Sequence, residues 1–186
     1  MSAVYALRLS VLLISSLVLS APLETNAACT AFVMRGGGTV LLAKNLDWPV
    51  GDGFVFVNKR DVIKEAFGAG PPIPLRWTSK YGSVTFNQFG REFPFGGINE
   101  AGLVIEELSA QAEYPPPDGR PCLNEFQWIQ YHLDTCRSIK EVLKSAAAVR
   151  VSKRLAGLHY LTADRRGNVA VVEFNDGQMA AHSGDS

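Results

Sequence analysis

The sequence predicts an α+β fold built on antiparallel hairpins. The order of its elements is the first indication, because strand-like runs come first, two helical stretches follow, and strands return. Glycine, asparagine and proline turn signals separate the runs, as in hairpins rather than in βαβ units. The chain of 186 residues is 47% apolar and 19% charged, which is typical of one globular domain with its own core.

The first element is not counted as part of the domain. Arg8 precedes an apolar run at residues 9–19, which is the length of a signal-peptide core and too short to span a bilayer. Pro22 then breaks the run. A short buried helix is the alternative. We expect residues 1–28 to be a removed signal peptide, so that the mature protein is periplasmic or secreted, with no stable membrane span.

Two cleavage sites compete at the end of this segment. A cut after Ala28 makes Cys29 the new N-terminus, whereas a cut after Ala27 leaves one alanine to trim. A lipoprotein signal also ends before a cysteine, although Asn26 stands where an aliphatic residue is usual. An uncleaved cytosolic chain is the third alternative, and it would leave no free amine on Cys29.

A β-hairpin is expected to open the mature domain. Residues 29–35 are β-rich, Gly36–Gly38 is a turn signal, and residues 39–42 form a second apolar run. Further strands are expected at 53–58, 82–87, 103–108, 157–163, 168–174 and 179–182, with loops or turns at 67–74, 98–102, 115–119, 165–167 and 175–177.

Two helices are expected in the second half of the chain. Within residues 124–137, Phe126, Ile129, Leu133 and Cys136 recur at helical spacing. Another helix is predicted to run to about residue 149. It begins at Ser138, which precedes Glu141 by three residues, the spacing of a capping box.

Composition excludes several classes of function. Eighteen basic residues balance eighteen acidic ones, which disfavours a nucleic-acid partner, since such proteins need a basic surface. His132, His159 and His182 lie at no metal-ligand spacing, and no phosphate-binding glycine loop occurs. We therefore expect neither a metal nor a cofactor.

Cys29 is the residue most suited to chemistry. If processing exposes it, one residue carries both a thiol and an α-amine. The amine titrates near working pH, at about 7.7–8.0, and can serve as the base for its own thiol. The alternative is a small residue that merely starts a strand.

The predicted hairpin returns two charged residues to the side of Cys29. Lys44 and Asp47 follow the second strand, about 15–18 residues after Cys29. A cation there stabilises a thiolate, and a carboxylate can hold the α-ammonium in place. A solvated strand edge is the alternative for both.

The motifs around these residues resemble the choloylglycine hydrolase and penicillin V acylase family of N-terminal nucleophile hydrolases. Cys29-Thr30-x-Phe32 and Lys44-Asn45-Leu46-Asp47-Trp48 resemble its nucleophile and Asn-x-Asp-Trp segments. Asn99-Glu-x-Gly102-Leu103 and the stretch 128–136 resemble two further segments. The similarity covers residues 29–180 and, with the Ala-Ala-Cys junction, is strongest to the Gram-negative periplasmic branch.

The resemblance implies a four-layer αββα fold and hydrolysis of a small-molecule N-acyl amide. Cys29 is implied as nucleophile and, through its amine, as base. Asp47 orients the amine, Lys44 replaces the family's arginine, and the backbone N–H of Ser109 is one oxyanion donor. Trp48 lines the acyl pocket or packs in the core. Penicillin V, acyl-homoserine lactones and conjugated bile salts stay open as substrates, and a homotetramer is implied.

Three departures from the family pattern are visible. Lys44 keeps the charge of arginine without its planar fork. Ser109 stands where the bile-salt branch has asparagine and the penicillin branch has tyrosine. Family members are about twice as long, so residues 29–186 are expected to be an N-terminal half, and Asn175, in a turn signal, is not the family's oxyanion asparagine. An inactive family member and a non-catalytic binding lipoprotein therefore remain alternatives.

The other two cysteines are predicted to be buried thiols. If residues 124–136 form one helix, its ends lie about 18–20 Å apart. A disulfide between Cys122 and Cys136 needs Cα atoms within about 7 Å.

Overall fold

A seven-stranded antiparallel sheet forms the centre of the computed structural model, which describes residues 29–67 and 73–184. The predicted signal peptide, residues 1–28, lies outside the described residues, as does the middle of the loop expected at 67–74. In spatial order the strands are β13 (Gln178–Gly184), β12 (Val169–Asn175), β11 (Leu158–Ala163), β8 (Val104–Ser109), β7 (Pro94–Asn99), β6 (Ser83–Asn87) and β3 (Phe54–Asn58).

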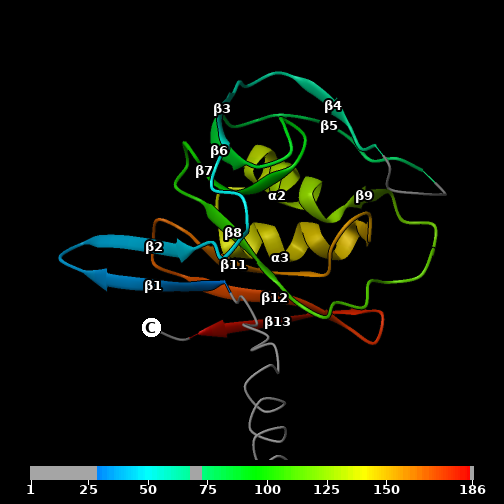
Figure 1. Ribbon diagram of the computed structural model, residues 1–186. Coiled ribbons are helices and arrows are strands. Elements are labelled where there is room, and N and C mark those ends of the chain that lie inside the picture. Colours follow the sequence, from blue (N-terminus) through cyan, green and yellow to red (C-terminus); the bar gives the residue numbers. More distant parts are fainter. Residues whose placement is uncertain (1–28, 68–72, 185–186) are drawn as a thin grey trace, which may run out of the picture.

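Two helices lie side by side against one face of this sheet (Figure 1). They are α2 (Glu125–Thr135) and α3 (Ile139–Ala148). Asn124 caps α2 by accepting hydrogen bonds from the backbone N–H groups of Phe126 and Gln127. Ser138 caps α3 by accepting from Glu141 N, as predicted. The Glu141 carboxylate accepts from Arg137 N, so it supports the residue before the expected position.

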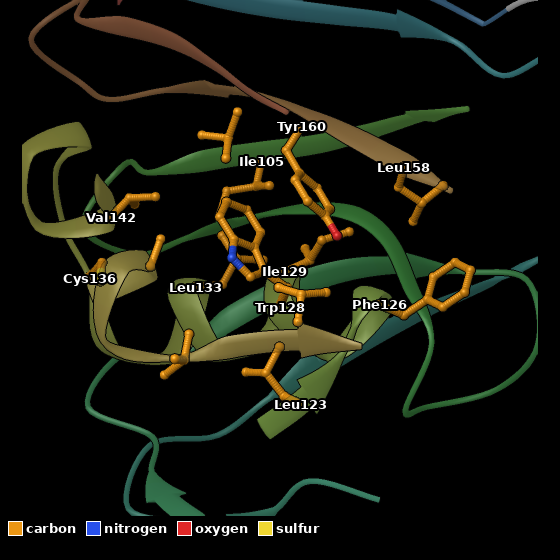
Figure 2. Close-up of a cluster of buried hydrophobic side chains, with 14 of the residues drawn as sticks. Ile105, Leu123, Phe126, Trp128, Ile129, Leu133, Cys136, Val142, Leu158 and Tyr160 are labelled. Atoms are coloured by element: carbon orange, nitrogen blue, oxygen red, sulfur yellow. The ribbon is translucent and has the colours of Figure 1, made fainter. Parts of the chain in front are cut away.

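The core lies between the helices and the sheet (Figure 2). Trp128 of α2 stacks on Tyr160 of β11, with ring centroids 4.1 Å apart and an interplanar angle of 17°. Both side chains are fully buried. Ile129 and Leu133, predicted for the apolar stripe of α2, are buried with them.

The predicted N-terminal hairpin is present and projects from the body of the molecule (Figure 1). Strand β1 (Thr30–Gly36) pairs with β2 (Thr39–Asn45). Gly37 and Gly38 have φ of 58° and 78°, so the two-residue turn needs the left-handed backbone that glycine adopts without strain. Strand β2 runs three residues past the predicted end at Leu42.

Strand β7 and four short strands were not predicted. Strands β4 (Ile63–Glu65) and β5 (Arg76–Thr78) form a second hairpin, and β9 (Cys122–Asn124) pairs in parallel with β10 (Arg150–Ser152). Each has three residues, which is too short for a periodic pattern.

The turn expected at residues 98–102 begins later than predicted. Strand β7 extends through Asn99, whose buried Nδ2 donates to Leu133 O and Cys136 O at the end of α2. Its Oδ1 accepts from the backbone N–H groups of Ala101 and Leu103. The Asn-Glu-x-Gly-Leu motif is therefore the junction between the sheet and α2.

The other face of the sheet is only partly covered. Hairpin β1–β2 lies over β8 and β11, where Leu161 is buried. Beyond it, Val55 pairs with Phe86, and Val57, Val84 and Ile98 stand side by side on three strands. We call Val55, Val57, Phe86 and Ile98, all exposed, the outer apolar patch.

Cys122 and Cys136 are buried, and neither takes part in a disulfide in the part of the chain that the structure describes. The prediction of two buried thiols is confirmed. Among the same residues, no helix is both long and apolar enough to cross a membrane.

Candidate active site

A cavity of about 190 Å³ adjoins Cys29 at the end of the hairpin. Its walls come from six parts of the fold: Cys29 before β1, the segment after β2, the loop between β6 and β7, the sheet, the start of α2 and the segment before β11. The lining is mainly apolar and aromatic, and Glu107 is its one charged side chain. The lining residues are Cys29, Leu46, Trp48, Phe89, Phe95, Glu107, Ser109, Phe126, Leu155, Ala156 and Leu158.

The hairpin places Cys29 at this cavity. Thr30 pairs with Asn45, so Cys29 stands one residue beyond the last pair and beside the segment that follows β2. Its side chain is half-buried. The predicted return of residues near position 45 to the side of Cys29 is therefore confirmed.

Lys44 is directed at carboxylates on β8. Its Nζ donates to Glu107 Oε1 at 2.9 Å and to the backbone oxygen of Phe95 at 3.3 Å, and it lies 3.7 Å from Glu106 Oε2. The β7–β8 ladder ends at the pair Gly96–Glu106, so the ammonium binds where the two strands diverge. Lys44 reaches the cavity of Cys29 through Glu107, and the thiolate role expected for it stays a prediction.

Glu106 and Glu107, the two carboxylates near Lys44, have different surroundings. Burial raises the pKa of Glu106 to about 7; Lys44 opposes the shift, and the neighbouring Glu107 adds to it. Glu106 lies on the hairpin side, over Gly96, where any Cβ would fall 1.9 Å from its Oε2. Glu107 points to the opposite side of β8, into the cavity.

Asp47 and Trp48 lie in the exposed segment after β2. Asp47 stands two residues past the Thr30–Asn45 pair, at the same end of the hairpin as Cys29. Trp48 lines the cavity and makes edge contacts with Phe89 and Phe95, with ring centroids 6.1 and 6.2 Å away. It is 43% exposed, so of its two predicted positions it takes the pocket wall rather than the core.

Ser109 ends β8 and also lines the cavity, opposite Leu158 in the sheet register. The structure therefore brings Cys29, Trp48 and Ser109 to one cavity. Lys44 is connected to that cavity by an ion pair, and Asp47 lies next to Trp48 in the exposed segment after β2.

Glu125 holds the remaining wall in place. Its fully buried carboxylate accepts three backbone hydrogen bonds, from Arg154, Leu155 and Ala156, at 2.8, 2.6 and 2.9 Å. This is a strong site for a carboxylate, because each oxygen is bound by N–H groups. The segment that presents Leu155 and Ala156 to the cavity is thus fixed to the first turn of α2.

The sequence reasoning missed both Glu107 and Glu125. A signal for Glu107 was available, because residues 103–108 were predicted to be a buried strand and yet contain two adjacent carboxylates. Acidic residues are almost never fully buried unless they are paired. No comparable local signal marks Glu125, since its partners lie about thirty residues further along the chain.

Among the described residues, no group of three or more His, Cys, Asp or Glu side chains is arranged to hold a metal ion. The histidines lie elsewhere. His132 is buried in α2, where its Nδ1 lies 2.8 Å from Trp128 O, and burial lowers its pKa to about 4. His159 and His182 flank Glu173 on the sheet at 3.4 and 3.3 Å.

Comparison with known proteins identifies a family and several proteins that this chain resembles. The model of the linear amide C–N hydrolases, choloylglycine hydrolase family, matches residues 29–186. Penicillin V acylase of Pectobacterium atrosepticum is 33% identical over an alignment of 177 residues, and the match covers 84% of this chain and 47% of that protein.

Solved structures give the same fold. Penicillin V acylase from Agrobacterium tumefaciens superposes with a TM-score of 0.72 at 29% identity, over 84% of this chain and 49% of that one. A variant of conjugated bile acid hydrolase from Clostridium perfringens superposes with a TM-score of 0.70 at 17% identity, over 83% and 51%. The chain thus spans about half the length of the relatives that it matches.

Proposed function

Because the chain belongs to the choloylglycine hydrolase family of linear amide C–N hydrolases, we propose that it hydrolyses N-acyl amides through a thioester on Cys29. The observation that carries the proposal is the position of Cys29 at the mouth of an apolar, aromatic cavity. Such cavities bind apolar ligands and use a few polar groups for orientation.

The chemistry begins with removal of residues 1–28, which frees the α-amine of Cys29. This amine accepts the thiol proton, and the thiolate attacks the carbonyl carbon of the amide. The tetrahedral oxyanion accepts a hydrogen bond from the backbone N–H of Ser109. Collapse breaks the C–N bond, the amine leaves with the proton, and an acyl thioester remains.

Water completes the cycle. The α-amine takes a proton from water as the hydroxyl attacks the thioester, the C–S bond breaks, and the free acid leaves with the thiol restored. Asp47 orients the α-ammonium during both steps. The positive charge of Lys44 offsets the negative charge of Glu107. Without Lys44, this negative charge would disfavour a thiolate at the same cavity.

The cavity favours a compact acyl group. Its volume of about 190 Å³ is below the roughly 300–1,000 Å³ of sites for drug-sized ligands. Four aromatic rings line it, from Trp48, Phe89, Phe95 and Phe126. An aryl-acyl amide of the penicillin V type therefore suits it better than a conjugated bile salt, and we propose that the mature protein acts on such amides in the periplasm or outside the cell.

The test combines intact mass with turnover. We expect the mature chain to begin at Cys29 with a free amine and to release amine from aryl-acyl amides, and we expect Cys29→Ser to abolish release while the protein stays folded. A diacylated Cys29 would support the lipoprotein alternative. An unmodified N-terminal cysteine without turnover would instead point to an inactive family member.

A further inference from the structure

A buried carboxylate in an apolar cavity calls for a ligand. Glu107 is 2% exposed, and it lies among the side chains of Phe95, Phe126 and Leu158. Within residues 29–67 and 73–184, the one bond of its carboxylate is from Lys44 to Oε1. Its Oε2 has no such donor and belongs to a side chain that lines the cavity.

An oxygen in this position accepts a hydrogen bond from whatever enters. Lys44 Nζ, at 2.9 Å, already compensates the charge of Glu107, and Lys44 would repel a second cation. A neutral donor such as a hydroxyl group gains a charge-assisted hydrogen bond without that repulsion. The pair of Lys44 and Glu107 therefore favours a ligand hydroxyl group over a ligand ammonium group.

The spacing of residues along β8 sets the distance between this hydroxyl and Ser109. Glu107 and Ser109 are two residues apart on β8 and line the same cavity, so they lie roughly 7 Å apart along the strand. Under the proposed function, Ser109 marks the place of the scissile carbonyl. A 4-hydroxyphenylacetyl group spans about this length, and its ring suits the aromatic walls.

We propose that Glu107 is a specificity-determining residue that selects aryl-acyl groups with a hydroxyl at their far end. The inference rests on the proposed function for the orientation of the acyl group. The hydroxyl donates its proton to Oε2 and no covalent bond changes, so the selection is exerted in binding.

The test measures binding separately from turnover. In a Cys29→Ser background, phenylacetamide and 4-hydroxyphenylacetamide are titrated by ligand-observed NMR. We expect the hydroxylated amide to bind about tenfold more tightly, the worth of one hydrogen bond to a charged group. Glu107→Leu is expected to remove this preference.

Glu106→Leu is the matched control. It makes the same change one residue away, beside the same lysine, on the face of β8 opposite the cavity. We expect it to keep the tenfold preference. Each variant leaves Lys44 with the other glutamate as partner, so its charge stays compensated. Glu107→Gln, a neutral isostere, is the second variant and is expected to reduce the preference to about threefold.

Equal affinity for the two amides in the parent, no binding of either, or a preference that survives Glu107→Leu would each overturn the proposal. Turnover of the same amides by the chain with Cys29 intact is assayed in parallel. Selective binding without turnover would contradict the proposed function and leave the role of Glu107 standing.

Discussion

The two faces of the seven-stranded sheet are built differently. The face under α2 and α3 buries Ile105, Tyr160 and Val172 completely. Among residues 29–67 and 73–184, the opposite face is covered only by hairpin β1–β2, and beside it Val57 is 68% exposed. The fold's stability therefore resides on the helix face, whereas the hairpin face keeps an apolar surface open to solvent.

The largest expected effect sharpens this contrast on the helix face. Trp128→Ala removes the ring that stacks on Tyr160, and we expect it to lower the free energy of unfolding by about 3–5 kcal/mol, as large core truncations do. Urea denaturation followed by circular dichroism measures the loss. A cost under about 1 kcal/mol would contradict the assignment of the core to this face.

The next effect compares how one residue on each face contributes to stability as the pH changes. On the hairpin face, the pKa of Glu106 rises from 4.5 to about 7, so its contribution to stability is present below pH 4.5 and is lost as the pH rises to 7. On the helix face, the pKa of His132 falls from 6.5 to about 4, so its contribution is present above pH 6.5 and is lost as the pH falls to 4.

Each pKa shift corresponds to about 3 kcal/mol in the free energy of unfolding. Between pH 4.5 and 6.5, the contribution of Glu106 to this free energy falls as the pH rises, whereas the contribution of His132 increases. Relative to the parent, Glu106→Gln should therefore make the free energy of unfolding rise more steeply with pH in this window. His132→Gln should make it fall. Urea midpoints at several pH values measure how the stability of each variant depends on pH. If the two variants showed the same pH dependence, the opposing contributions of Glu106 and His132 would be refuted.

The smallest effect concerns the outer apolar patch. Val57→Thr changes an exposed side chain with few contacts to lose, so the free energy of unfolding should shift by no more than about 0.5 kcal/mol. The same change should reduce self-association in sedimentation velocity, because exposed apolar surface promotes it. An effect on stability as large as that of Trp128→Ala would erase the difference between the faces.

Local patterns predicted the N-terminal hairpin, both helices and six of the seven strands of the central sheet, but not β7. The Gly36–Gly38 signal located the hairpin, and the Ser138 cap located the start of α3. The short strands β9 and β10 escaped prediction because residues 122 and 150 meet only through tertiary structure. Similarly, Cys29 was identified from its place after the predicted signal peptide and Trp48 from a motif, but the contacts of Glu107 and Glu125 depend on partners that are distant in the chain.

The attachment of the hairpin has a consequence for the order of folding. Pairing of β1 with β2 is local and closes over two glycines, so it forms fast. The bonds from Lys44 to Phe95 and Glu107 span 51 and 63 residues, and such contacts form only after the intervening chain is arranged. Cys29 therefore adjoins one of the first segments to acquire structure and is among the last residues to reach its place at the cavity. In a partly folded chain, the hairpin is therefore paired before the cavity beside Cys29 is complete.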